Sequence, residues 1–96
     1  MAPYSPPNTF YREIKGIEDK DIMFRIVGKN GNHFKYLTSK LEIEYLWWDM
    51  KRNVVEVWGP HKKLISASEE VVNWMLKMKD NFMTNYEYAL MDRAII

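Results

Sequence analysis

Two glycines three positions apart, Gly28 and Gly31, enclose Lys29 and Asn30 in the stretch RIVGKNGNHFK. The main chain of such a loop can come close to an anion such as a phosphate, because glycine has no side chain in the way. Lys29 would add a positive charge and Asn30 a hydrogen-bond donor. The same composition is typical of a tight turn between two helices. Both interpretations are compatible with this stretch taken alone.

The common nucleotide-binding loops do not match this stretch. A Walker loop requires G-x-x-x-x-G-K followed by Ser or Thr, whereas Asn30 follows Lys29 and the nearest earlier glycine is Gly16. The dinucleotide fingerprint G-x-G-x-x-G is also absent from the sequence. The sequence therefore indicates no cofactor.

Other residue types that carry chemistry are few or scattered. The only histidines, His33 and His61, lack a local metal-binding spacing, and no cysteine supports them. We interpret His33 as a surface residue at a helix start, with a ribose or base contact as the functional alternative. Glu42 and Glu44 are better explained as a solvated strand edge than as an acid–base pair. We expect neither enzymatic activity nor a metal site.

Composition indicates one globular domain of 96 residues, 47% of them hydrophobic. There is no cysteine, no signal-peptide pattern and no apolar run of the roughly 20 residues that span a bilayer. We therefore expect an intracellular protein, with cytoplasm and nucleus not distinguishable. Net charge is only +1, but residues 20–40 carry five basic residues against Asp21 alone, which makes +4. The positive charge thus gathers around the glycine pair.

Hydrophobic periodicity places the glycine pair between two helices. Residues 18–27 carry acids at the start and then a buried stripe that includes Met23 and Ile26, with Phe24 off the stripe. Gly28 closes this helix. A second helix is predicted over 32–41, with Asn32 as its cap.

The remaining segments complete an α+β chain. Strands are predicted over 9–15, 42–50 and 54–58, and a long amphipathic helix over 61–79. The order β-α-α-β-β-α predicts one sheet with helices on one face. Residues 1–8, rich in proline, are expected to form an extended tail, so the domain spans 9–79. Residues 80–96 form a C-terminal extension that is predicted to be helical, as a last helix or a continuation.

At this point the motif and the element order converge on a family. The stretch IVGKNGNHFKYL resembles the I-I-G-x-x-G-x-x-I-K-x-L signature of K-homology (KH) domains, and VVEVWGP resembles their last strand and turn. The resemblance covers about residues 10–79. It implies the type I arrangement, a three-stranded antiparallel sheet backed by three helices.

The resemblance also implies a function, the binding of about four nucleotides of single-stranded RNA or DNA. In this family the GxxG amides approach the phosphates, a basic residue in the loop adds charge, and the second helix offers a lysine to the backbone. Strand 42–50 would form the opposite wall of the groove. The residues that match binding positions are Arg25, Ile26, Gly28, Lys29, Asn30, Gly31 and Lys35.

A second interpretation keeps the KH-like fold and changes its use. Phe24 stands where the family usually has glycine, so its ring would either fill the groove or serve as a stacking platform. Glu42 and Glu44 make the strand wall acidic, and residues 80–96 are rich in apolar side chains. The tryptophans at 47, 48 and 58 are expected to be divided between the core and an exposed aromatic patch. The domain would then be a protein-interaction or assembly module that forms a homo-oligomer or binds a protein partner through 80–96.

Overall fold

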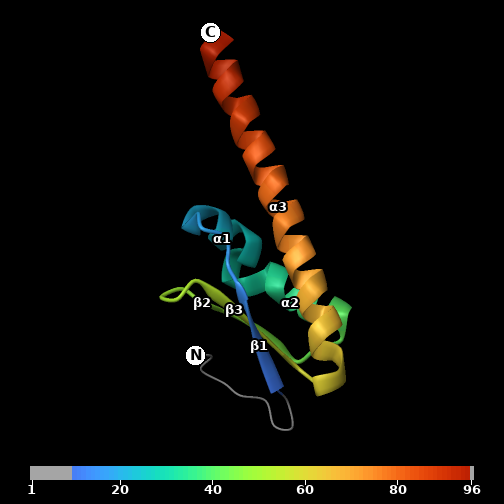
Figure 1. Cartoon of the computed structure of the whole chain (residues 1–96). Helices are drawn as coiled ribbons and strands as arrows, with labels where there is room; N and C mark the ends of the chain where they lie inside the picture. The colour runs from blue at the N-terminus through green and yellow to red at the C-terminus, as the bar shows by residue number, and fades with distance from the viewer. Residues whose placement is uncertain (1–9, 96) are drawn as a thin grey trace.

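A computed structural model describes the backbone of residues 10–95 and the side chains of residues 10–82. In these residues the chain is α+β with a three-stranded antiparallel sheet, which confirms the predicted class. The elements are β1 (Phe10–Lys15), α1 (Lys20–Val27), the short 3-10 helix η1 (Lys29–Gly31), α2 (Asn32–Leu41), β2 (Tyr45–Asp49), β3 (Val54–Gly59) and α3 (His61–Ile95) (Figure 1). The expected tail over 1–8 lies outside the described residues.

The sheet has the strand order β1-β3-β2, so β3 is central and both neighbours run antiparallel to it. Val55 of β3 lies between Ile14 of β1 and Trp48 of β2, and Val57 lies between Arg12 and Leu46. Because side chains alternate along a strand, these residues share one face of the sheet.

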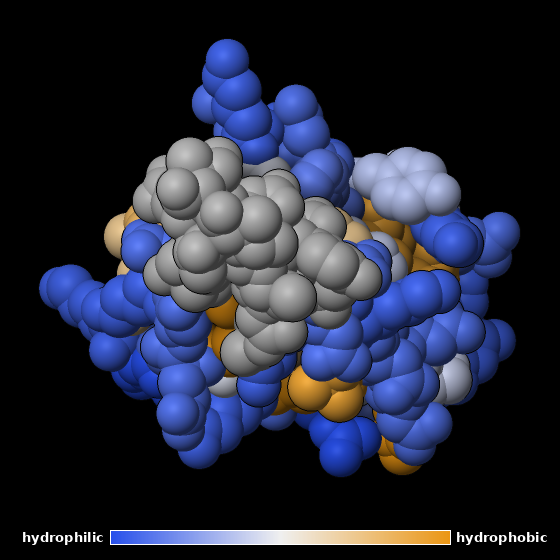
Figure 2. Space-filling model, turned by 90° about the horizontal axis from the view of Figure 1, so that it is seen from above, coloured by the Kyte–Doolittle hydropathy of each residue, from blue (hydrophilic) through white to orange (hydrophobic). Residues whose placement is uncertain are grey.

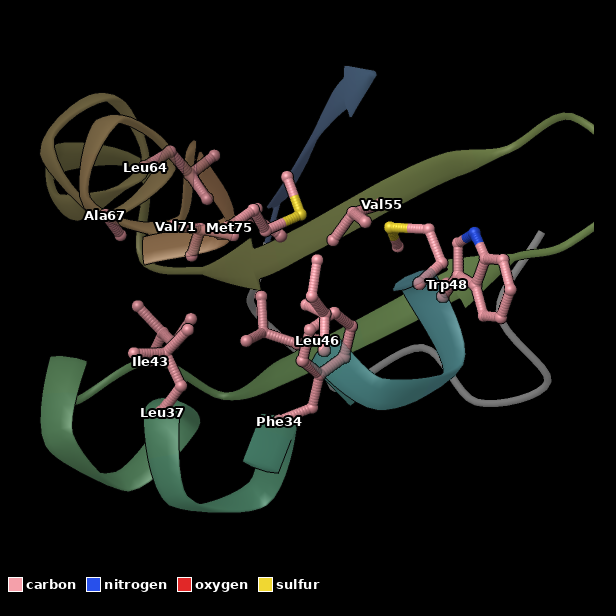
Figure 3. Packing of buried hydrophobic residues seen from close by; sticks show 13 residues of the cluster. Phe34, Leu37, Ile43, Leu46, Trp48, Val55, Leu64, Ala67, Val71 and Met75 are labelled. Atoms are coloured by element: carbon pink, nitrogen blue, oxygen red, sulfur yellow. The ribbon is translucent and has the colours of Figure 1, made fainter. Parts of the chain in front are cut away.

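The hydrophobic core forms on that face. Side chains from α1, α2 and α3 meet the sheet there, and Figure 3 shows Phe34 and Leu37 of α2 on one side with Val71 and Met75 of α3 on the other. Full burial of each such side chain contributes roughly 1.5–3 kcal/mol. The fully buried hydrophobic residues are Met23, Ile26, Val55, Val57, Val71 and Met75.

The helix starts differ slightly from the sequence prediction. Asp19 caps α1, since its Oδ1 accepts hydrogen bonds from the amides of Asp21 at 2.9 Å and Ile22 at 3.3 Å. The predicted cap Asn32 is instead the first residue of α2, and Gly31 precedes it in a left-handed conformation without a side-chain hydrogen bond. Glycine adopts that conformation without a Cβ clash, so no polar cap is needed to turn the chain.

The second strand is shorter than predicted, because residues 42–44 do not belong to it. Glu42 ends α2 with φ 56°, and its amide donates to the carbonyl of Ser39 at 3.2 Å. The amide of Ile43 donates to Thr38 in the same way. These bonds use the backbone groups of residues 42 and 43 to close the helix, so the strand begins at Tyr45.

α3 passes the predicted helix end at residue 79 without a break and rises well beyond the body of the molecule (Figure 1). The chain measures 57 × 24 × 20 Å along its principal axes, so this helix sets the longest dimension. Seen from above, the side chains that are not grey are mainly hydrophilic, with small hydrophobic areas between them (Figure 2). Within the described residues, no helix combines the length and the apolar character needed to span a membrane.

Candidate nucleic-acid interface

An open groove of about 1230 Å³ lies between the α1–α2 joint and β2. It exceeds the roughly 300–1,000 Å³ of pockets that enclose small ligands, so it suits an extended chain. Its floor and walls carry apolar and aromatic side chains, and its rim is polar. The lining residues include Phe24, Gly28, Asn30, Gly31, Lys35, Leu46, Trp48 and Lys51.

Gly28 shapes the loop end of the groove. Its φ of 84° and ψ of 163° belong to a region that only glycine populates. A Cβ built there would lie 2.7 Å from Cγ of His33 and 2.9 Å from its backbone nitrogen. The main chain therefore turns at this point only because residue 28 has no side chain.

Asn30 and Gly31 complete the loop with positive φ values of 56° and 73°. The Gly31 amide donates to the carbonyl of Gly28 at 3.0 Å, which folds the loop into a compact turn. A Cβ at Gly31 would meet nothing within 4 Å. Gly31 thus contributes its backbone conformation and leaves open space for a ligand.

His33 is a link between the two helices. Its Nδ1 lies 3.0 Å from the carbonyl oxygen of Arg25, close to the end of α1. This contact joins the start of α2 to the end of α1, and His33 is not among the residues that line the groove. The exposed imidazole therefore has a structural role in positioning the glycine pair.

The floor of the groove is aromatic. The Phe24 ring is 55% exposed and meets the Trp48 ring edge to face, with centroids 5.1 Å apart. Trp48 is buried, and its Nε1 donates to Oδ1 of Asn53 at 2.9 Å. Asn53 in turn donates from Nδ2 to the carbonyl of Ile17 at 2.8 Å, which fixes the indole in place. In Figure 3 the Trp48 indole lies beside α1.

The outer edge of β2 turns main-chain groups toward the groove. The Gly16 amide donates to the carbonyl of Asn53, just before β3, at 2.9 Å, so residues 55, 57 and 59 of β3 also bond toward β1. Their neighbours in β3 bond toward Tyr45, Trp47 and Asp49 of β2. By the same alternation, the N–H and C=O groups of Leu46 and Trp48 point to the open side. The groove thus has main-chain donors and acceptors along one wall.

The charges of the rim are mixed. Lys35 of α2 and Lys51 of the β2–β3 turn are exposed and positive. Arg52 is held by Glu13, with Nη2 and Oε1 2.8 Å apart, and by Asp49, with Nε and Oδ2 3.0 Å apart. The carboxylate of Glu13 and then that of Asp49 raise the pKa of Arg52 further above its usual range. This guanidinium therefore remains charged and is used mainly in joining the strands.

The acidic wall expected from Glu42 and Glu44 is only half present. Glu44 lines the groove, whereas Glu42 points to Lys63 of α3, with Oε2 and Nζ 3.3 Å apart. The wall carries less negative charge than the sequence suggests, because Glu42 belongs to the end of α2 and not to the strand.

The residues predicted from the binding motif are divided by the structure. Gly28, Asn30, Gly31 and Lys35 line the groove, and Lys29 is exposed on the same loop, outside the lining. The other two predicted residues do not line it. Ile26 is fully buried in the core, and the guanidinium of Arg25 lies 5.8 Å from the centre of the Phe82 ring of α3.

The predicted aromatic patch is also divided. Trp48 and Trp58 are buried, and only Trp47 remains half-buried, stacked with Tyr45 at a centroid distance of 6.3 Å. Trp58 stacks on Tyr11 at 4.5 Å on the sheet face away from the core. The exposed aromatic surface of the groove therefore comes mainly from Phe24.

Several groove residues were missed by the sequence reasoning. Thr38 and Ser39 of α2 lie three and four residues after Lys35, so helical spacing could have placed them on the same face. Met50 and Lys51 come from the β2–β3 turn, and no local pattern places that turn beside α1. In the described residues, no group of three or more His, Asp or Glu side chains could hold a metal ion.

Comparison with known proteins found no match to a protein-family model, to a curated protein or to a solved structure.

Proposed function

We propose that the protein binds single-stranded nucleic acid, RNA above all, in the groove between the Gly28–Gly31 loop and the edge of β2. The observation that carries this proposal is the combination of a loop that only glycine can form with an aromatic floor and outward main-chain groups. The glycine loop would contact the phosphates, whereas the aromatic floor and the main-chain groups would contact the bases.

The loop would hold the phosphate backbone. Open space around Gly31 lets an anion approach the main chain, and Lys29 adds an exposed positive charge beside it. Lys35 and Lys51 flank the path of the backbone along the rim. About four nucleotides would fill the groove, as in the family whose signature the loop resembles.

The floor and the strand edge would hold the bases. Phe24 offers an exposed ring for stacking, and the main chain of Leu46 and Trp48 offers donors and acceptors to base edges. Because the groove remains open beside the Phe24 ring, we favour a ring on which a base stacks over a ring that fills the groove.

The proposal includes the type I K-homology arrangement as its fold, with α1, α2 and residues 61–79 of α3 as the helices behind the sheet. The strand–helix–loop–helix order around the glycine pair supports it, as does the antiparallel sheet. Within this arrangement the protein is a binding module without catalytic activity.

A double variant, Lys29→Asp with Asn30→Asp, tests the proposal. Both side chains are exposed, and Asp tolerates the left-handed conformation of residue 30, so the fold should remain intact. The change replaces one positive charge by two negative charges beside the phosphates. We expect binding of short random-sequence RNA, measured by fluorescence anisotropy, to fall by at least about a hundredfold.

The matched control is Lys77→Asp with Asn81→Asp. It changes the same residue types and the net charge equally, at exposed positions of α3 that do not line the groove. An equal loss of RNA affinity in both double variants would mean that only the net charge matters. Unchanged RNA binding in the loop variant would contradict the proposal. Amide NMR shifts centred on the loop and β2 would locate the ligand directly.

A second candidate function is assembly, with the same fold acting through residues 80–96. The continuation of α3 beyond the body favours it, as does the acidic Glu44 on the groove rim. Truncation after Asn81 separates the cases by size and circular dichroism. Loss of a complex with the fold retained would support assembly, and loss of folding would show that the segment completes the domain.

A further inference from the structure

β1 forms the edge of the sheet opposite the groove. Within the described part of the chain, β3 is the only strand that pairs with it. Five of its six residues are exposed, Ile14 being the partly buried one. An open strand edge of this kind is a template for another strand.

The backbone groups that face outward can be identified. The Gly16 amide donates to the Asn53 carbonyl, so Ile14 and Arg12, two and four residues earlier, also bond inward to β3. Tyr11, Glu13 and Lys15 therefore direct their N–H and C=O groups to the open side. These three residues are the ones that a further strand would engage.

A narrow groove of about 350 Å³ runs beside this edge, between β1 and α3. Arg12 and Ile14 of β1 line it, opposite Ile65 and Glu69 of α3. The Ile65 side chain is 63% exposed although it is apolar. Ser68, in the same groove, is 3% exposed, and its hydroxyl has no hydrogen-bond partner among the described residues.

We propose that this face pairs two copies of the chain, β1 against β1 and antiparallel. A two-fold axis beside Glu13 places Tyr11 opposite Lys15 of the second copy, so all three outward residues find main-chain partners. The same register places Arg12 opposite Ile14 of the second copy. Arg12 then enters the groove that holds Glu69, and the two copies exchange this charge pair reciprocally.

The one like-charge contact on the axis is already compensated. The two Glu13 side chains would face each other on the outer side of the sheet, where each accepts two hydrogen bonds from its own Arg52, at 2.8 and 3.3 Å. Two arginines thus accompany the two carboxylates. The exposed Ile65 side chains would lose water contact in the same interface.

This inference goes beyond the proposed function and does not rest on it. The paired edge is β1, whereas the nucleic-acid groove lies along β2 at the other side of the sheet. A dimer of this kind leaves the nucleic-acid groove of each copy open. Two linked grooves would bind one longer strand with higher avidity than either alone.

Sedimentation equilibrium of the full-length chain tests the pairing, with Ile65→Glu as the variant. We expect a concentration-dependent dimer, and a dissociation constant raised at least about tenfold by the variant, since both copies lose the contact. The control is Tyr36→Glu on α2, where the replaced side chain is 62% exposed and lines neither groove. It should leave the dissociation constant unchanged.

Amide hydrogen exchange gives a second readout that does not depend on a variant. Protection of Tyr11, Glu13 and Lys15 should rise with protein concentration, whereas Arg12 and Ile14, bonded to β3, should be protected throughout. A monomer at all concentrations would overturn the proposal. So would a dimer that Ile65→Glu does not weaken and in which these three amides stay unprotected.

Discussion

The two edges of one small sheet are built for different partners. Along β2, the neighbouring helices leave an open groove of about 1230 Å³ with the exposed ring of Phe24 and the glycine loop at its end. Along β1, α3 lies close and leaves about 350 Å³, with Arg12 and Glu69 as its charges. In the part of the chain that the structure describes, both edges have outward main-chain groups without a strand partner, so hydrogen bonding alone does not distinguish them.

What distinguishes the edges is the element that flanks each strand. Beside β2, the joint between α1 and α2 contains two glycines without side chains. This leaves space for bases and phosphates next to the main chain. Beside β1, α3 leaves only a small groove, which has room for the side chains of a further strand, and β1 offers the charged residues Arg12, Glu13 and Lys15. The difference shows that the helix or loop beside an open strand edge decides which kind of partner the edge can bind.

The largest effect is expected at the glycine joint of the β2 edge. Gly28→Ala would place a Cβ against His33 at a φ of 84°, and should lower the free energy of unfolding by about 3 kcal/mol. Gly31→Ala, with open space around it, should lower it by only about 1 kcal/mol. Urea unfolding measures both, and equal losses would refute the steric account of the loop.

Asn53 connects the two edges, and its loss is the next largest effect. Its side chain accepts from Trp48 and donates to Ile17, and its carbonyl accepts from Gly16. Asn53→Ala should cost about 2 kcal/mol of unfolding free energy and change the tryptophan fluorescence. Asn53→Asp retains the acceptor for Trp48, so its fluorescence should stay closer to that of the parent. A change of fluorescence in both variants would contradict this link.

Phe24 sharpens the comparison within the β2 groove. Phe24→Ala should weaken RNA binding by about tenfold, because stacking on an aromatic ring contributes 1–3 kcal/mol per base. Its effect on stability should be small, since the ring is 55% exposed. Anisotropy titrations give the affinity. A tighter complex would mean that the ring obstructs the groove, and dimerisation through β1 should not change in either case.

The smallest expected effect is that of salt concentration, which should weaken RNA binding along β2 more than pairing through β1. With roughly three to five basic residues along the RNA, the slope of log affinity against log salt should be about −2 to −3.5. A doubling of salt then weakens RNA binding roughly fourfold to tenfold. Pairing through β1 combines main-chain bonds and Ile65 with the two Arg12–Glu69 pairs, so only a part of it is sensitive to salt and its dissociation constant should change less. The same salt series in sedimentation provides the comparison, and equal sensitivity would count against it.

Sequence reasoning recovered those parts that depend on a few consecutive residues. Alternation, glycine chemistry and helical spacing predicted the strand that is described over Phe10–Lys15, the joint at Gly28, and the buried pair Met23 and Ile26. The order of the elements predicted one sheet, and the resemblance to K-homology domains implied that it is antiparallel. Each of these signals acts within about one or two turns of chain.

The composition of the groove followed only in part. The motif assigned Arg25 and Ile26 to the groove. In the structure α1 is oriented so that Arg25 lies over the Phe82 ring and Ile26 is buried in the core. Glu42 was assigned to a strand, but it closes α2 and pairs with Lys63. Helix rotation and helix ends depend on packing against distant residues, which no local pattern contains.

The sequence by itself determined the glycine joint, the amphipathic stripes and the α+β class, because propensity and periodicity are properties of neighbouring residues. The tertiary structure alone decided that Phe24, Trp48 and Asn53 share one network, and that β1 has no second strand partner among the described residues. Phe24 is far from Trp48 and Asn53 in the chain, and β1 is far from α3, so only the packing of one complete core sets their distances and directions.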